Sequence, residues 1–303
     1  MNAPHIPVLL DHVLELFSTL KSGIVVDCTV GYGGHAEAIL QHYPHLSYIG
    51  IDQDEEALAF SRARLASFGE RVRLIHGRAS EILPTLIHEP VVAVLADIGV
   101  SSLQLDKSER GFGFESETLD MRMDRDRALT AKEVVNRYPV HELERILKEY
   151  GEERHYKKIA RLIDEARKKA EITSAKELAQ LIARYFPKGR IHPATLTFQA
   201  IRIEVNDELS ELQRLLEAVK ELGKGVIVGI ISFHSLEDRI VKQTFKEWAK
   251  SCICPAEAMR CVCGNDHALG EILTKRPLEA SEEEIKFNPR ARSAKLRAFR
   301  FRS

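Results

Sequence analysis

The sequence predicts an α/β protein in which a largely parallel sheet is interrupted by an inserted helical domain. Strand-like apolar segments alternate with helical segments over the first hundred residues, which is typical of parallel strands joined by right-handed crossovers. Residues 105–130 are rich in charge and glycine, helical patterns follow, and a strand pattern returns only at residues 226–233. An insertion between the fourth and fifth strands explains this order.

Four strands are expected before the insertion and two after it. They are short runs of mainly apolar residues, most of them rich in β-branched residues. The strands cover residues 24–28, 48–52, 72–76, 91–97, 226–233 and 296–301, and helices are expected at residues 36–42 and 55–66.

Helices are expected beyond residue 150 because apolar residues recur three and four positions apart. The sets are Ile159, Leu162, Ile163 and Ala166; Leu178, Leu181, Ile182 and Tyr185; and, in residues 207–222, Leu209, Leu212, Leu216 and Val219. We therefore expect a sheet domain made of residues 1–104 and 191–303, and a mainly helical domain made of residues 105–190.

Composition limits the class of protein. The 303 residues suffice for one large and one smaller domain. A net charge of -1 gives no global attraction to nucleic acid, so such binding would need a local patch. Asp11 and His12 interrupt the first apolar stretch, and no run approaches the ~18 apolar residues of a membrane span. We expect a cytoplasmic protein without a signal peptide, whose cysteines are thiols or metal ligands.

A glycine-rich turn after the first strand is the most informative feature of the chain. It contains Gly31, Gly33 and Gly34, and glycine lets the backbone approach a ligand closely. The second strand ends in Asp52, about 20 residues further on, where a carboxylate can accept both hydroxyls of a ribose. These features predict a nucleoside cofactor. Because Gly31-x-Gly33-x-x-Ala36 also fits the dinucleotide fingerprint, the turn alone leaves a nicotinamide cofactor open.

Two polar segments follow the fourth and fifth strands, at the sheet edge where α/β proteins bind ligands. The first contains Asp97, Ser101 and Ser102, and the second contains His234. The structural alternatives are a helix N-cap for Asp97 and a packed histidine for His234.

Four cysteines form a compact group, Cys252-x-Cys254 and Cys261-x-Cys263. Four thiolates can hold a structural zinc ion in tetrahedral geometry, although C-x-x-C is the commoner spacing. Reduced thiols that pack a loop remain the alternative.

Two groups of basic residues are candidates for binding nucleic acid, because clustered cations can neutralise phosphates. One is Arg290, Arg292, Lys295, Arg297, Arg300 and Arg302 near the C-terminus, and the other is Arg154, Lys157, Lys158 and Arg161. For the first group the alternative is an edge strand with alternating exposed charges.

The chain resembles the MraW-type family of 16S ribosomal RNA cytosine-N4 methyltransferases, which use S-adenosylmethionine. The motifs include Leu119-Asp120-Met121-Arg122-Met123-Asp124 and Asn288-Pro289-Arg290-Ala291-Arg292-Ser293. Further matching blocks are residues 5–10, 27–35, 97–104, 110–112, 150–153, 192–195, 197–203 and 232–242. The resemblance implies a Rossmann-like methyltransferase sheet and 16S ribosomal RNA, free or within the small ribosomal subunit, as substrate. A dehydrogenase would explain none of the later blocks.

The resemblance also implies cofactor contacts at Gly33, Gly34, His35, Asp52, Ala79, Asp97 and Gln104. The glycine turn would cradle the methionine moiety, Asp97 would pair with its ammonium group and Asp52 would hold the ribose. Gln104 would close the pocket. Ala79 departs from the aromatic residue that is usual at the adenine position, so stacking is lost there.

The catalytic residue is left unassigned among four candidates: Asp97, Ser101, Ser102 and His234. The reaction needs positioning and an acceptor that directs the amine lone pair at the methyl group. The segment from Leu119 to Asp124 would order a loop over the substrate or form a structural ion-pair cluster. A non-catalytic RNA-binding or ribosome-assembly protein with a degenerate cofactor fold is the second functional class.

Overall fold

The computed structural model describes residues 7–101, 104–105, 107–186, 189, 191–255, 257 and 260–303. The chain forms two compact units. The sheet unit consists of Met1–Gly99 and Glu211–Ser303, and the helical unit consists of Val100–Ser210. None of the described helices is both long enough and apolar enough to cross a membrane.

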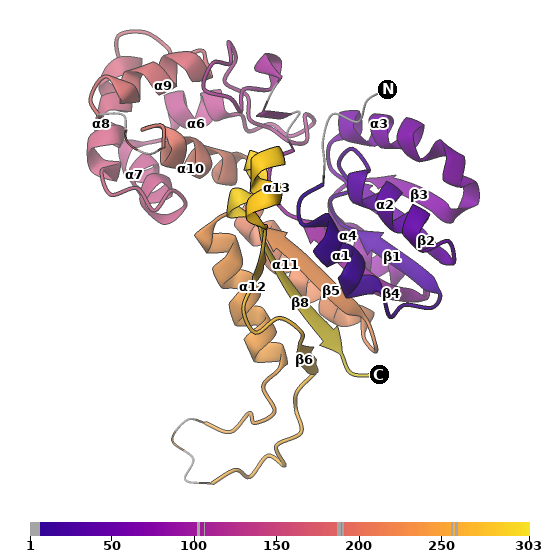
Figure 1. Ribbon diagram of the computed structural model, residues 1–303. Helices are drawn as coiled ribbons and strands as arrows, with labels where there is room; N and C mark the ends of the chain where they lie inside the picture. The colour runs from indigo at the N-terminus through magenta and orange to yellow at the C-terminus, as the bar shows by residue number, and fades with distance from the viewer. Residues whose placement is uncertain are drawn as a thin grey trace. The chain divides into compact units, whose positions relative to one another are not determined.

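The sheet unit is built on eight described strands in the order β3-β2-β1-β4-β5-β8-β6, with β7 also paired to β8. Strands β1 to β5 are parallel, whereas β8 runs antiparallel to β5 (Figure 1). The strands are β1 (Gly23–Asp27), β2 (Leu46–Asp52), β3 (Val72–His76), β4 (Val91–Asp97), β5 (Ile227–Ser232), β6 (Gly270–Ile272), β7 (Leu278–Glu279) and β8 (Lys295–Phe301).

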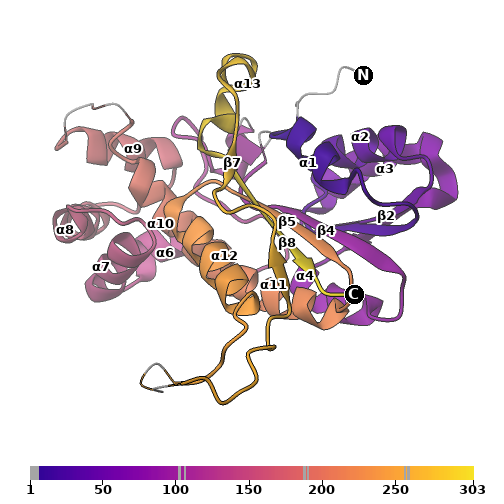
Figure 2. The ribbon, with the colours of Figure 1, turned by 60° about the horizontal axis from the view of Figure 1, so that its bottom comes forward.

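Helices cover both faces of this sheet because successive strand residues point to opposite sides. Val25 packs against α1 (Leu10–Phe17), α2 (Gly34–His42) and α3 (Glu55–Leu65). Val26 belongs to the opposite core, with α4 (Ala79–Ile82), α11 (Glu208–Leu222) and α12 (Ser235–Trp248). Figures 1 and 2 show helices on both faces of the sheet. The short elements are η1 (Ala66–Arg71), η2 (Leu83–Leu86), α13 (Glu282–Phe287) and η4 (Pro289–Ser293).

In the helical unit, five of the described helices pack around one core. They are α6 (Ala131–Arg137), α7 (Val140–Glu149), α8 (Tyr156–Arg167), α9 (Ala175–Ala183) and α10 (Thr195–Asn206), preceded by η3 (Ser108–Arg110). Phe198, Ile201 and Val205 of α10 are buried in the same core as the other four helices. The helical unit therefore extends to residue 210, beyond the expected boundary at residue 190, because α10 packs with the insertion.

The expected α/β fold with an insertion between the fourth and fifth strands is confirmed, since β4 and β5 pair directly in register. Two local expectations are wrong. Tyr185 lies beyond α9 and is 52% exposed, so it is no part of the buried stripe. Strand β8 is an interior strand between β5 and β6 and is largely buried, so the edge-strand alternative fails.

Candidate cofactor and catalytic site

Polar residues gather at the carboxyl edge of the sheet. Asp27, Asp52 and Asp97 are the last residues of β1, β2 and β4, and Ser232 ends β5. The strand order reverses between β1 and β4, which are neighbours although two strands separate them in the chain. Open α/β sheets bind ligands in the crevice at such a reversal.

The glycine turn after β1 is tied to the end of β2. The N–H of Gly31 donates to Asp52 Oδ2 at 2.7 Å, and the N–H of Asp54 donates to Oδ1 at 2.9 Å. Gly33 has φ 74°, and a Cβ there would lie 3.1 Å from Ser61 Oγ. Burial raises the pKa of Asp52 to about 7. Each carboxylate oxygen retains a second lone pair, so Asp52 can still accept two ribose hydroxyls.

Asp97 lies beside this turn. Its N–H donates to Thr29 Oγ1 at 2.7 Å, which links the ends of β4 and β1. Its buried Oδ1 accepts no hydrogen bond from any described residue, and Oδ2 lies 3.9 Å from His35 Nδ1. Burial, with added repulsion from Asp27 and Glu237, raises the pKa of Asp97 well above its ordinary value. The carboxyl group therefore has no cationic partner in the part of the chain that the structure describes.

His35 cannot act as that cation. Its Nε2 lies 2.9 Å from the carbonyl oxygen of Val8, which can only accept, so Nε2 carries the hydrogen. Burial lowers the pKa of His35 to about 4. The imidazole is therefore neutral near pH 7, and its Nδ1 faces Asp97 as an acceptor.

Asp27 is a buried carboxylate to which the sequence analysis gave no role. It accepts from Tyr48 Oη at 2.7 Å and from the N–H of Thr29 at 3.0 Å. Burial raises its pKa to about 6. Asp27 thus fixes the Thr29 segment that in turn holds Asp97. The two-residue spacing of Asp27 and Thr29 could have indicated a local turn. The sequence could not show the bond to Tyr48, because Tyr48 lies on another strand.

His234 is the N-cap of α12. Its Nδ1 accepts from the N–H of Glu237 at 3.5 Å, and Glu237 Oε2 accepts from the N–H groups of Phe233 and His234. Its Nε2 lies 3.0 Å from Glu237 Oε1 but is buried and forms no hydrogen bond with a described residue. These contacts give His234 a structural role, so its catalytic role stays a prediction.

The remaining predicted residues fall into three groups. Ala79 is buried as the first residue of α4 and packs in the same core as Cys28. Ser101 and Gln104 belong to the helical unit, where the N–H of Ser101 donates to Gln104 Oε1 at 2.9 Å. Ser102 lies outside the described residues.

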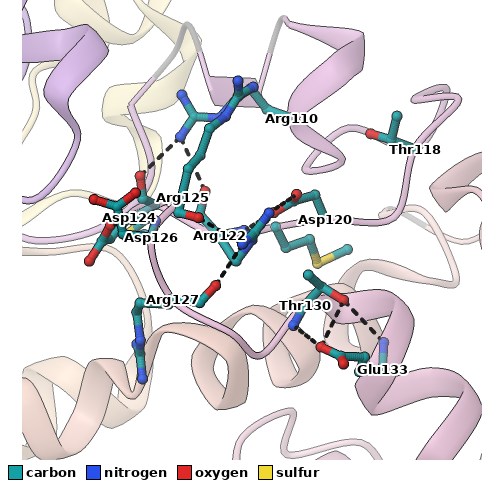
Figure 3. A network of polar contacts seen from close by, with 12 residues as sticks. Arg110, Thr118, Asp120, Arg122, Asp124, Arg125, Asp126, Arg127, Thr130 and Glu133 are labelled. Carbon is teal, nitrogen blue, oxygen red and sulfur yellow. Dashed lines mark hydrogen bonds and ion pairs between the residues drawn. The ribbon is translucent and has the colours of Figure 1, made fainter.

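The loop before α6 in the helical unit is folded around two arginines (Figure 3). Arg110 is buried and donates to the carbonyl oxygens of Arg122 and Met123, both at 3.1 Å. Arg122 forms a two-point ion pair with Asp120 at 2.9 and 2.8 Å. The ion pair fixes the backbone of the loop locally, because Asp120 and Arg122 are only two positions apart.

The four cysteines predicted as metal ligands come together in the segment between α12 and β6. Their Sγ atoms all lie within 4.8 Å of one another. The N–H of Asn265 and that of Ile253 bind Cys263 Sγ and lower the pKa of this thiol to about 5. The structure therefore places four potential ligands in one cluster.

The predicted basic group at the C-terminus is largely engaged within the sheet unit. Arg297 is buried and pairs with Asp238 at 2.7 Å, Arg300 lies 3.6 Å from Glu271, and Arg302 pairs with Asp266. A groove of about 410 Å³ nearby is lined by Lys242, Lys246 and Lys275, among others. Arg290 and Arg292 are exposed.

The second basic group is exposed on the helical unit. Arg154, Lys157, Lys158 and Arg161 are all exposed, and none of the four forms an ion pair with a described residue. Two aromatic rings lie among them. Phe186 is 5.1 Å from His155, and Lys158 Nζ lies 4.8 Å from the centre of the Phe186 ring.

Known proteins match the whole chain. The sequence profile of the MraW methylase family matches residues 2–302. Ribosomal RNA small subunit methyltransferase H from Wolinella succinogenes is 60% identical over 304 residues, which is 100% of both chains. Proteins of the same name from Sulfurovum sp. and Nitratiruptor sp. are 57% and 58% identical, over 100% of this chain and 99% and 100% of theirs. The chain belongs to the MraW methylase family.

Proposed function

We propose that this chain transfers the methyl group of S-adenosylmethionine to N4 of a cytosine in 16S ribosomal RNA. The matching relatives bear the name of small-subunit ribosomal RNA methyltransferases. The structural observation that carries the proposal is Asp97 Oδ1, which is buried and has no hydrogen-bond partner among the described residues. Such a group is costly unless a ligand pairs with it, and an ammonium group is the natural partner.

The residues at the sheet edge fit the parts of this cofactor. Asp97 would pair with the ammonium group of the methionine moiety, since neutral His35 supplies no charge there. The turn at Gly33 would leave room for the methionine backbone. Asp52 would accept the ribose hydroxyls with the lone pairs that Gly31 and Asp54 leave free.

S-adenosylmethionine supplies a methyl group on a cationic sulfur, which leaves as a neutral thioether. The chain has to hold the cytosine amine in line with that methyl group, and positioning of this kind can supply much of the rate enhancement. We assign to Asp97 the role of accepting a hydrogen bond from the cytosine amine. Neither carboxylate oxygen of Asp97 accepts a hydrogen bond from a described residue, so both are available. His234 is already bound to the start of α12.

The helical unit would bind the RNA through the surface formed by the exposed side chains of Arg154, His155, Lys157, Lys158 and Arg161 and the half-buried ring of Phe186. The surface joins α8 to the end of α9, and these helices pack against each other. Cations that lack acidic partners can neutralise phosphates, and exposed rings can stack on unpaired bases. This combination suits single-stranded RNA better than a purely charged surface would.

The test has two steps. Calorimetry of the purified chain with S-adenosylmethionine asks whether the cofactor binds. Methylation of small ribosomal subunits and of free 16S RNA from cells that lack the modification, followed by mass spectrometry of the nucleosides, asks for N4-methylcytosine. Binding with methylation supports the proposal. Absence of cofactor binding would favour a non-catalytic RNA-binding protein, and binding followed by methylation elsewhere would overturn the assigned target.

A further inference from the structure

The segment between α12 and β6 carries no helix or strand among its described residues. In Figures 1 and 2 it runs outward from the end of α12 and returns to β6. None of the described residues from 251 to 270 is buried. Ile253 and Val262 are 56% and 77% exposed. A segment with no apolar core of its own needs another device to hold it in one conformation.

The four cysteines provide the geometry of such a device. The Sγ atoms of Cys252 and Cys261 are 3.6 Å apart, those of Cys261 and Cys263 are 3.5 Å apart, and those of Cys263 and Cys252 are 3.7 Å apart. A tetrahedral zinc ion with Zn–S bonds of about 2.3 Å separates its sulfurs by about 3.8 Å. A disulfide needs about 2.05 Å, so these sulfurs are spaced for a shared metal and not for bonding to each other.

Backbone groups support the sulfurs in a crosswise pattern. The N–H of Ile253, between the first two cysteines, donates to Cys263 Sγ at 3.4 Å. The N–H of Val262, between the second two, donates to Cys254 Sγ at 3.3 Å. Such bonds stabilise thiolates, which are the form that binds a metal. Ile253 and Val262 are therefore held in position by the backbone hydrogen bonds to the cysteines, although their side chains are exposed.

A tight turn completes the cluster. Gly264 and Asn265 follow Cys263 with φ of 83° and 56°, which turns the chain back sharply. His267 Nε2 lies 2.7 Å from the carbonyl oxygen of Cys263, and the N–H of His267 donates to the carbonyl oxygen of Ser251 at 2.9 Å. Hydrogen bonds to the residues around a ligand set its orientation.

We propose that Cys252, Cys254, Cys261 and Cys263 bind one structural zinc ion, which holds the segment between α12 and β6 in its fold. Four sulfurs in tetrahedral arrangement are the ligand set of structural zinc, and all four positions are filled by protein. No position is left for water or substrate, so the ion has no part in methyl transfer. The site is independent of the proposed reaction.

Metal analysis of the full-length chain tests the proposal. The chain is purified under reducing conditions without a histidine tag, next to C252S/C261S and to Cys28→Ala, which alters the cysteine outside the cluster. We expect about one zinc per chain in the parent and in Cys28→Ala, and none in C252S/C261S. Equal zinc in all three, no zinc in the parent after incubation with zinc, or bound iron in its place would overturn the proposal.

Two measurements on the unaltered chain remain informative if the double variant fails to fold. Cobalt added to the metal-free chain should give the intense visible absorption of a tetrahedral cobalt–thiolate site, and zinc should abolish it. Removal of zinc should make residues 251–269 sensitive to protease, and added zinc should restore resistance. A weak octahedral cobalt spectrum, or proteolysis that zinc does not change, would contradict the site.

Discussion

Thr29 and Asp97 join two strands that are distant in sequence: the N–H of Asp97 donates to Thr29 Oγ1 at 2.7 Å. Thr29 is itself held by Asp27, which accepts from its N–H at 3.0 Å. The place where the strand order reverses is therefore locked by the side chains of Asp27 and Thr29 at the end of β1 and by the backbone N–H of Asp97 at the end of β4. The lock holds the unpaired carboxylate of Asp97 beside the glycine turn.

Asp97→Ala should abolish tight binding of S-adenosylmethionine. Removal of one partner of a desolvated ion pair costs about 3–5 kcal/mol. Cofactor affinity should therefore fall by several hundred-fold or more. Calorimetry measures the affinity, and thermal unfolding verifies that the variant is folded. If Asp97→Ala binds the cofactor within tenfold of the parent, the pocket is misplaced.

Cofactor binding should be linked to the release of a proton. Burial keeps the pKa of Asp97 well above its ordinary value in the free protein, so the free carboxyl group holds its proton to a higher pH than an ordinary aspartate does. An ammonium partner favours the carboxylate, and the proton then leaves. Calorimetry in buffers of different ionisation enthalpy counts released protons. Asp97→Asn should release clearly fewer, and an unchanged proton count would argue against the pairing.

The stability of the cofactor-free chain should fall as the pH rises from about 5 to 7.5. Burial raises the pKa of Asp27 to about 6 and that of Asp52 to about 7, so the folded chain holds protons that the unfolded chain has lost. Their stabilising contribution is complete below about pH 4 and is lost as the pH passes the folded values. Urea unfolding across this pH range measures the free energy of unfolding. Asp52→Asn should flatten the dependence of this free energy on pH.

Thr29→Ala should weaken the lock between β1 and β4, whereas Thr29→Ser should preserve it. The alanine variant leaves the N–H of Asp97 without its acceptor, which costs about 1–3 kcal/mol of unfolding free energy. Since Asp97 then loses its position, cofactor affinity should fall as well. Equal stability and affinity in the alanine and serine variants would show that the hydroxyl contributes nothing.

Lys157→Glu with Lys158→Glu should impair RNA methylation and leave cofactor affinity unchanged. Both side chains belong to the basic and aromatic surface of α8, and reversal of two charges repels phosphates. The kcat/KM for RNA should fall at least tenfold, and the loss should shrink at high salt. Lys169→Glu, an exposed site beyond the end of α8, is the control. Similar losses in the control would indicate a general charge effect.

The sequence predicted most of the sheet because its parallel strands are short, apolar and bounded by turn residues. Asp52 and Asp97 could be found because each ends such a strand. The lock could not, since the bond between Asp97 and Thr29 joins residues at the ends of different strands, and no local pattern reports it. The sequence also did not show where the insertion ends. Only the packing of Phe198 in the core of the helical unit shows that α10 belongs to that unit. Local patterns identify elements, whereas partners depend on packing.

A crystal structure of the chain with S-adenosylmethionine or its demethylated product is the most direct test of the cofactor pocket. The amino group of the methionine moiety should lie within about 3.2 Å of Asp97 Oδ1, and the ribose hydroxyls should bind Asp52. An amino group bound by other residues, with Asp97 Oδ1 still unpaired, would show that Asp97 does not bind the cofactor.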